Sequence, residues 1–417
     1  MNNISDGGGR ARERTRRFFP ELEGLRGFAA IMVLLSHVAI STGQVGWAGQ
    51  PAPDGLTGAV LNKMEVGLPI FFVLSGALLY RPFALATLGG AAKPAARPYF
   101  WRRALRILPA YWLLCAVALP LLNGDRIDGA WQVLRPLLLL HVYEQDGTFA
   151  GAALPAGLEQ TWSLSTEVAF YLTLPLLAGL LGWFARGVDD PARRMRRIVL
   201  PLGAAVLAGF GAVAYTHLPA RGPFPVEHLW PLEYVGFFAV GMALATLSAG
   251  AELFPGAVPR PYRLVAGHPV RCWLAALAVF VMLCLSPVGE PASSEYPAVD
   301  AALVDQALHQ LFTLLLVAPL TVPGARSRLV EAVLANPVSR FLGRISYGVF
   351  LWHLLVFYVW HGSLFGATGF WKALAVVLAG SVTAGTLSFQ LVERPFMRLR
   401  PLLGRAPAKP SVVTTTR

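Results

Sequence analysis

The stretch RGFAAIMVLLSH, from Arg26 to His37, decides the fold class. Ten residues that suit a lipid-facing helix lie between a guanidinium and an imidazole. An ionisable side chain within a membrane span costs about 2.5–3.5 kcal/mol on insertion scales, so each one needs a partner or a function. The two residues are about 16 Å apart along a helix. We therefore expect Arg26 near one membrane edge and His37 past the middle.

The composition of the whole chain agrees with a membrane location. Of the 417 residues, 55% are hydrophobic and only 14% are charged, and the mean hydropathy is +0.55. Soluble domains carry about 25% charged residues. Apolar runs of roughly 18 residues or more, long enough to cross a bilayer, recur along the chain. The sequence predicts an all-α polytopic membrane protein.

The apolar runs predict ten transmembrane helices within a single membrane-embedded domain. We expect a disordered, Arg-rich tail at 1–19, the membrane domain at 20–396 and a second tail at 397–417. The expected spans are residues 27–44, 64–84, 104–122, 162–184, 197–216, 230–249, 270–287, 303–322, 341–360 and 371–391.

The distribution of positive charge predicts the orientation. With the N-terminus inside, 30 of the 35 Lys and Arg residues fall in inner segments, as the positive-inside rule requires. Both termini are then cytoplasmic, in a multi-pass protein of the plasma membrane that contacts its lipids. The net charge of +12 does not indicate nucleic-acid binding, because the arginines form short clusters between apolar runs. The three cysteines have no ligand spacing, so we expect no metal site and no disulfide framework.

One apolar segment does not fit the span pattern. WQVLRPLLLLHVYE (131–144) is short and is interrupted by Arg135 and Pro136. Counting it as a span would move an Arg-rich loop to the outside. We interpret it as a re-entrant or interfacial segment on the outer face, which predicts an outer vestibule, since irregular backbone at membrane depth needs protein or water around it.

Two histidines are expected at one membrane depth. His353, in ISYGVFLWH, lies about as far into the ninth span as His37 lies into the first. A pair of histidines at one level suggests a polar cavity between helices. The alternative is that each ring bonds a backbone carbonyl and only stabilises packing.

WSLSTEVAFY (162–171) opens the fourth span and carries Glu167. A glutamate that faces a bundle interior is usually paired or functional. The neighbouring hydroxyls of Ser163, Ser165 and Thr166 are expected either to solvate this carboxylate or to cap the helix start.

Three arginines mark the start of the third span, in YFWRRALRILPAYW (99–112). Arg103 and Arg106 share one helix face, and two guanidiniums on one face suit a polyanion such as a nucleotide diphosphate. The alternative is plain anchoring beside anionic lipid. Elsewhere, Ser75-Gly76 suggests close helix packing, and VERPF (392–396) suggests an acid–base pair at the interface.

Five of these stretches, in this order, resemble the acyltransferase 3 family of integral-membrane acyltransferases, over residues 20–396. They are GLRGFAAIMVLLSH, FFVLSGALL, RRALRILPAYW, WSLSTEVAFY and ISYGVFLWH. The family's essential arginine and histidine on the first helix fall on Arg26 and His37. Its R-x-x-R falls on Arg103 and Arg106, and its W-S-L-x-x-E falls on Trp162 to Glu167.

The sequence departs from the family pattern at two points. The usual Asp before G-L-R-G is Glu23 here, which keeps the charge. The extra C-terminal hydrolase-like domain that some members carry does not follow, so a partner or a different acceptor is expected to replace it.

The resemblance implies transfer of an acyl group, often acetyl, from cytoplasmic acyl-CoA to a hydroxyl of a saccharide, glycolipid or small molecule, with no tightly bound cofactor. It implies His37 as the general base and Arg26, Arg103 and Arg106 as donor-binding groups. Glu167 is expected to be catalytic, by binding an acceptor hydroxyl or by orienting a histidine. Further residues expected to line the site are Glu23, Ser75, Trp162, Ser163, Tyr171, Tyr347 and His353.

Two other classes of function remain open from the residues alone. A transporter or flippase also has many spans with polar groups near the midplane, but it predicts inverted repeats with broken helices, which are not evident here. A non-catalytic scaffold that binds a lipid-linked glycan predicts normal function after His37→Ala. The acceptor and the oligomeric state are not encoded in any pattern that we can identify.

Overall fold

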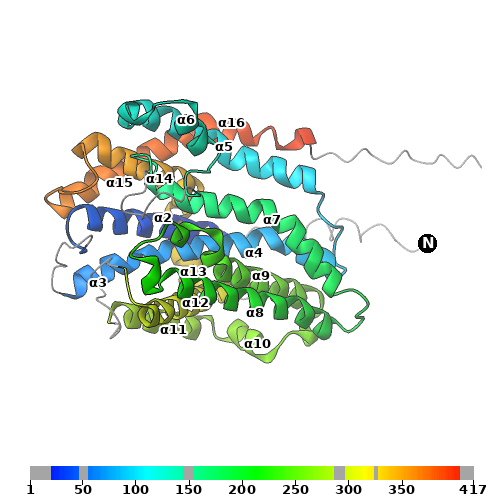
Figure 1. Ribbon diagram of the computed structural model, residues 1–417. Coiled ribbons are helices and arrows are strands. Elements are labelled where there is room, and N and C mark those ends of the chain that lie inside the picture. The colour runs from blue at the N-terminus through cyan, green and yellow to red at the C-terminus, as the bar shows by residue number, and fades with distance from the viewer. Residues whose placement is uncertain (1–19, 47–54, 144–153, 286–295, 324–326, 404–417) are drawn as a thin grey trace, which may run out of the picture.

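The computed structural model describes residues 20–46, 55–143, 154–285, 296–323 and 327–403, and this part of the chain is a helical bundle without strands (Figure 1). The expectation of an all-α protein is therefore confirmed. The helices are α2 (Pro20–Ser41), α3 (Leu56–Asn62), α4 (Gly67–Thr87), α5 (Ala96–Leu122), α6 (Ala130–Leu137), α7 (Trp162–Phe184), α8 (Pro191–Thr216), α9 (Pro231–Leu253), α10 (Arg260–Gly267), α11 (Pro269–Cys284), α12 (Val299–Thr321), α13 (Arg328–Leu334), α14 (Pro337–His361), α15 (Phe370–Ser388) and α16 (Arg394–Met397).

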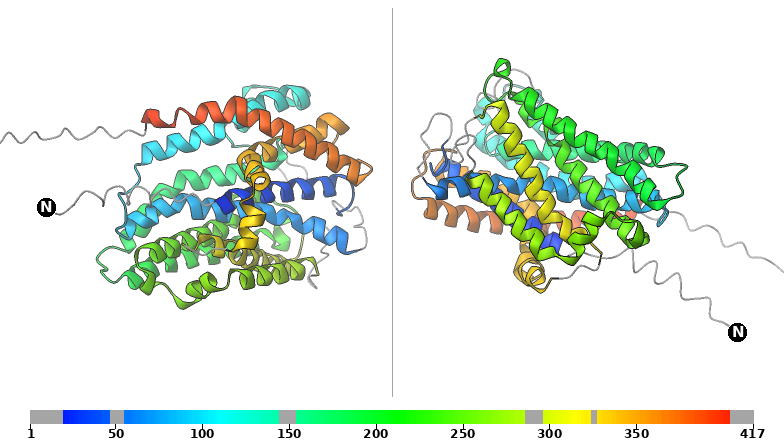
Figure 2. Two further views of the ribbon diagram at one scale, coloured as in Figure 1. Left: turned by 180° about the vertical axis from the view of Figure 1, so that it is seen from behind. Right: turned by 90° about the horizontal axis from the view of Figure 1, so that it is seen from below.

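Nine helices of the described chain are long and apolar enough to cross a membrane, one fewer than expected. The missing span is α11, which has only 16 residues and extends about 24 Å, less than the roughly 30 Å of a hydrocarbon core. The start of α2 and the end of α16 lie on the same side of the bundle (Figures 1 and 2). Two ends on one side require an even number of crossings, and we infer that α11 provides the tenth.

Glycines let the central helices approach closely. A Cβ on Gly27 of α2 would lie 2.8 Å from the backbone nitrogen of Gly343 in α14. Between α4 and α9, a Cβ on Gly241 would lie 2.1 Å from the Val73 carbonyl oxygen. These are small-residue interfaces of the kind that stabilise helix pairs in membranes. The contact of Gly27 with Gly343 holds α2 parallel to α14 and determines which residues of the two helices lie side by side.

The segment around α6 does not cross the bundle. The carbonyls of Pro136 and Leu137 accept hydrogen bonds from Tyr111 (2.5 Å) and Trp112 (3.1 Å), near the middle of α5. These contacts hold the segment against the side of α5.

The residues that lead into α7 also reach the bundle interior. Gln160 is 2% exposed, and its amide donates to the Leu351 carbonyl, in the middle of α14, at 2.6 Å. Helix α7 therefore begins at mid-depth and is shifted along the bundle axis relative to α2.

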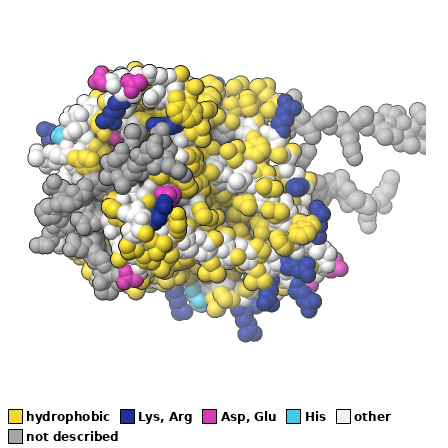
Figure 3. Space-filling model, viewed as in Figure 1, with side chains coloured by type: hydrophobic (Ala, Val, Ile, Leu, Met, Phe, Trp, Pro, Cys, Tyr) yellow, Lys and Arg dark blue, Asp and Glu magenta, His cyan; other side chains and the backbone are white. Residues whose placement is uncertain are grey.

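Hydrophobic and charged side chains lie on different parts of the surface. In Figure 3, the broad middle of the face is hydrophobic, and most Lys and Arg side chains lie toward the right and lower edges. At the C-terminal end, residues 400–403 form a short turn, and Trp101 of α5 donates to the Leu399 carbonyl at 3.1 Å. The packed chain thus continues past residue 396, whereas the expected tails at 1–19 and 404–417 lie outside the described residues.

Candidate active site

A small cavity lies between α2, α4, α7 and α14. It is partly open, and its empty volume of about 370 Å³ includes solvent at its mouth. Its walls are mainly apolar, and one guanidinium and one carboxylate are among the groups that line it. The lining residues are Arg26, Leu68, Phe71, Phe72, Ser163, Leu164, Glu167, Tyr347 and Phe350.

Glu167 is held by two hydroxyl groups from different helices. The hydroxyls of Ser75 (α4) and Tyr171 (α7) both donate to its Oε1 oxygen. Because α7 begins at mid-depth, Glu167 in its second turn reaches the level of Arg26, which lies near the start of α2. The shift of α7 thus brings the carboxylate to the arginines.

The hydroxyls expected to solvate Glu167 or cap its helix do neither. Ser163 donates to the Gln160 carbonyl (3.1 Å) and Thr166 to the Leu229 carbonyl (3.0 Å). Ser165 is buried, and its hydroxyl has no partner within the described part of the chain. Helix α7 also starts without a side-chain cap. The prediction failed because α7 does not start at a membrane surface, where those groups would have faced water.

Three arginines converge on this carboxylate. Arg26 is within electrostatic range of Glu167, Arg103 and Arg106. The guanidinium carbon of Arg26 lies 5.7 Å from the centre of the Phe71 ring, and that of Arg103 lies 5.9 Å from the centre of the Tyr171 ring, which are cation–π distances.

A second buried acid balances part of this charge, and the sequence analysis assigned it differently. Glu393 is 1% exposed and accepts from Arg106 Nη1 at 2.8 Å, so its partner is an arginine of α5 rather than its neighbour Arg394. A five-residue π-helical turn, Phe389–Glu393, directs it inward, as π turns often do at functional sites. Arg400 also lies within electrostatic range of Arg103 and Arg106, so the guanidiniums outnumber the two carboxylates, which favours an anion.

The two histidines that were expected at one depth are in contact with each other. His353 Nε2 lies 3.3 Å from His37 Nδ1, and the ring centres are 4.9 Å apart. His353 is 1% exposed, and its Nδ1 lies 2.7 Å from the Phe350 carbonyl oxygen. His37 does not line the cavity. Phe350 does, and its ring centre lies 6.0 Å from that of His353.

Two other expected site residues lie just outside the cavity. The backbone of Glu23 abuts Gly343, one turn before Arg26. The Trp162 ring packs 5.1 Å from the Tyr234 ring and joins the apolar cluster that covers the re-entrant segment. Tyr347 lines the cavity and fixes α14 to α5, because its hydroxyl donates to the Ile107 carbonyl at 2.9 Å.

A histidine of segment 131–144 was not among the expected site residues. His141 is 4% exposed, and its Nε2 lies 3.1 Å from the Thr161 hydroxyl. That hydroxyl donates to the Leu158 carbonyl (2.6 Å), so His141 Nε2 is the donor. Burial, aided by the nearby Arg135 charge, lowers the pKa of His141 to about 4. The sequence did offer a signal for this buried histidine, because His141 ends the apolar run that follows Pro136.

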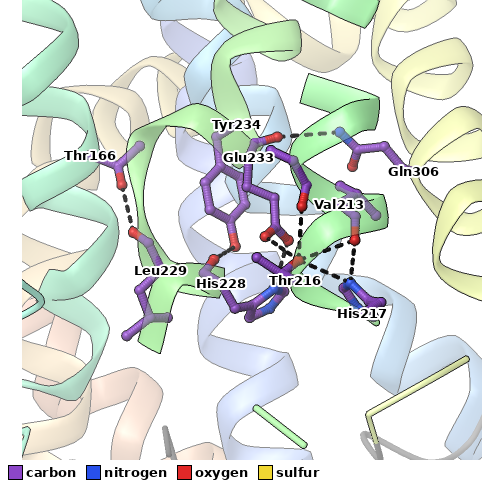
Figure 4. Close-up of polar contacts among 10 residues, drawn as sticks. Thr166, Val213, Thr216, His217, His228, Leu229, Glu233, Tyr234 and Gln306 are labelled. Carbon is purple, nitrogen blue, oxygen red and sulfur yellow. Dashed lines mark hydrogen bonds and ion pairs between the residues drawn. The ribbon is translucent and has the colours of Figure 1, made fainter. Parts of the chain in front are cut away.

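A second polar cluster, shown in Figure 4, lies at the opposite end of the bundle from the start of α2. Glu233 of α9 accepts from the Thr216 hydroxyl (2.9 Å) and lies 2.6 Å from His228 Nδ1. The Thr166 contact ties α7 to this cluster through Leu229. These groups contact one another at the ends of α8 and α9, and we assign the cluster to packing.

One nearby group has the composition of a metal site. Glu65, Asp305 and His309 bring ligand atoms within 4.8 Å of one another. However, the Lys63 ammonium lies 2.7 Å from Asp305 and 3.9 Å from Glu65. The positive charge that these acids require is thus supplied by the chain itself.

Comparison with known proteins identifies the family. A family model described as an acyltransferase domain matches residues 19–391. The chain is 30% identical to the acyltransferase MdmB of Streptomyces mycarofaciens, over 93% of this chain and 92% of that protein. It is 26% identical to the peptidoglycan O-acetyltransferase OatA of Listeria monocytogenes, over 92% of this chain and 56% of that protein. No solved structure matches the chain significantly.

The family match covers nearly all of the membrane-embedded bundle. It includes α2 with Arg26 and His37, α5 with Arg103 and Arg106, and α14 with His353. The chain therefore belongs to the acyltransferase 3 family of integral-membrane O-acyltransferases.

Proposed function

We propose that this membrane acyltransferase moves an acetyl group from cytoplasmic acetyl-CoA to a hydroxyl of a saccharide, glycolipid or small molecule. The observation that carries the proposal is the arrangement along α2. Its arginine lies in a net positive cluster, and its histidine lies about 16 Å further along the same helix. A donor with phosphates at one end of a long flexible arm and a thioester at the other suits this spacing.

In this proposal the arginine cluster binds the phosphates of CoA. Arg103 is the best placed, since it makes no ion pair with a carboxylate within the described chain, whereas Arg106 is bonded to Glu393. Guanidinium groups grip phosphate oxygens with two parallel hydrogen bonds. The pantetheine arm then extends along α2 past Phe71 and Phe350 toward His37.

The reaction itself needs one proton acceptor. The acceptor hydroxyl oxygen attacks the thioester carbonyl carbon, and His37 takes the hydroxyl proton. The carbon–sulfur bond then breaks, and the CoA thiolate leaves and takes up the proton. A neutral imidazole near pH 7 suits both proton transfers. Glu167, which accepts two hydroxyl donors already, has the chemistry to bind an acceptor hydroxyl.

The test uses the native cells, so that the acceptor need not be known. A strain that lacks the gene is complemented with wild type or His37→Ala, and esterified acetyl released by mild alkali is measured. We expect loss of at least 10²-fold in His37→Ala, while the purified variant still binds acetyl-CoA. Normal ester acetylation in His37→Ala would contradict the catalytic role. Equal ester acetylation with and without the gene would contradict the reaction.

A further inference from the structure

We propose that His353 is a positioning residue that fixes the tautomer and orientation of His37, so that His37 Nε2 is the atom that accepts the proton. This inference rests on the proposed role of His37 as the base. It concerns the edge of the imidazole that reacts, which neither the family match nor the motif specifies.

The helix packing places the two rings together. Gly27 and Gly343 are in contact where α2 and α14 run parallel. Each histidine lies ten positions beyond its glycine, so equal rise along both helices brings the rings to one level. The resulting distance of 3.3 Å between His353 Nε2 and His37 Nδ1 is a hydrogen-bond distance.

The contacts of the two rings allow one set of neutral tautomers. His353 Nδ1 lies 2.7 Å from the Phe350 carbonyl oxygen, so this nitrogen carries the hydrogen and Nε2 carries a lone pair. His37 Nδ1 lies 2.9 Å from the Val33 carbonyl oxygen, and it also faces that lone pair. The opposite tautomer of either ring would set a nitrogen lone pair against a carbonyl oxygen.

The outcome for His37 is a protonated Nδ1 and a basic Nε2. Two acceptors, an oxygen and a nitrogen, hold the Nδ1 hydrogen, whereas Nε2 has no hydrogen-bond partner within the described residues. His37 is half-buried, whereas His353 is buried. Of the two rings, the accessible one is therefore His37, which we assign as the base. Serine hydrolases orient their histidine in the same way, with a bonded Nδ1–H and a reactive Nε2.

The pair also responds to the charge that forms during transfer. When His37 Nε2 takes the hydroxyl proton, the ring becomes an imidazolium and its Nδ1–H bond to His353 becomes charge-assisted and stronger. This stabilisation is present in the transition state and absent from the ground state, so it acts on turnover. The Val33 carbonyl alone supports the tautomer less well, because it also accepts the backbone hydrogen bond of the helix.

The experiment compares His353→Leu with His353→Gln. Leucine removes the acceptor, whereas glutamine places its Oε1 as many bonds from Cβ as the histidine Nε2, and so restores an acceptor. We expect ester acetylation in cells to fall on the order of 10- to 100-fold in His353→Leu, the size typical of losing a group that orients an imidazole. In His353→Gln it returns to within about fivefold of wild type, and acetyl-CoA binding is unchanged in both.

A direct readout of the tautomer accompanies the activity assay. Protein labelled with ¹⁵N-histidine is examined by solid-state NMR, and the His37 signals are assigned by their loss in His37→Ala. We expect a neutral His37 protonated at Nδ1 in wild type and in His353→Gln, and a mixture of tautomers in His353→Leu. A wild-type His37 protonated at Nε2 would overturn the inference.

The outcomes separate the two proposals. If His37→Ala keeps its activity, the base assignment fails whatever His353 does. If His37→Ala is inactive and His353→Leu acetylates like wild type, the positioning role alone fails. Equal losses in the leucine and glutamine variants, with stable protein, would show that His353 only fills space.

Discussion

At the scale of single residues, Arg103 and its neighbour Arg102 provide a matched pair. Only Arg103 stacks on Tyr171, which itself holds Glu167. Replacement by lysine keeps the charge and removes the planar fork. We expect acetyl-CoA to bind about 5- to 10-fold more weakly to Arg103→Lys, a change of roughly 1 kcal/mol, and with wild-type affinity to Arg102→Lys. Titration calorimetry on purified protein measures the affinity for acetyl-CoA. Equal affinities in both variants would show that Arg103 does not bind the donor and only anchors α5 at the membrane surface.

His141 predicts a pH dependence of stability. Its pKa is about 4 in the folded chain and about 6.5 in an unfolded one. Between these values the unfolded state binds the extra proton, so stability is complete above pH 6.5 and declines as the pH falls toward 4. The expected loss between pH 7 and pH 5 is about 2 kcal/mol.

The comparison with His141→Gln isolates this effect from other titrating groups. Glutamine keeps an N–H donor for the Thr161 hydroxyl but does not titrate. Thermal unfolding in detergent at pH 7 and pH 5 should show a smaller decrease in midpoint for the variant. Equal decreases would place His141 in contact with water.

At the scale of elements, the contact of α2 with α14 depends on glycine. A Cβ at Gly343 would lie 2.0 Å from the Glu23 carbonyl oxygen, whereas Gly203 of α8 has open space at that position. We expect Gly343→Ala to lower the thermal midpoint and to abolish ester acetylation, because the helices must separate and carry the histidines apart. Gly203→Ala should be neutral or slightly stabilising, since alanine favours helix. Wild-type acetylation in Gly343→Ala would show that activity does not require the close contact between α2 and α14.

The same elements show how far sequence reasoning reaches. Hydropathy predicts the helices, and the positions of His37 and His353 within their spans predict that both lie at one depth. Their contact was not predicted, because the sequence does not show that α2 packs against α14. The level of α7 is not predictable in this way, because it depends on the Gln160 contact with α14, nearly two hundred residues away in sequence. For the same reason, the contacts of Glu167 with Ser75 and of Glu393 with Arg106 were missed, since Ser75 and Arg106 lie on helices distant in sequence.

At the scale of the whole molecule, the orientation in the membrane remains a prediction. Asp189 and Asp125 are both exposed and lie in loops predicted to face the cytoplasm and the outside, respectively. In a background without native cysteines, Asp125→Cys should react with an impermeant thiol reagent in intact cells. Asp189→Cys should react only after the membrane is opened. The reverse pattern would invert the topology and place the arginine cluster on the outer side.

The segment that leads into α7 also has a consequence for biogenesis. Helices leave the ribosome in order and enter the membrane as they are made, yet Gln160 and Glu159 bond to Leu351 and to Tyr358 (2.6 Å each) in the second-to-last long helix. Contacts this distant along the chain form late, because a long loop must close first. Until α14 arrives, the buried polar groups around residue 160 lack their native partners within the bilayer. Assembly of the cavity therefore waits for the end of synthesis, and a nascent chain that stalls before α14 would present an incomplete bundle to the cell's quality control.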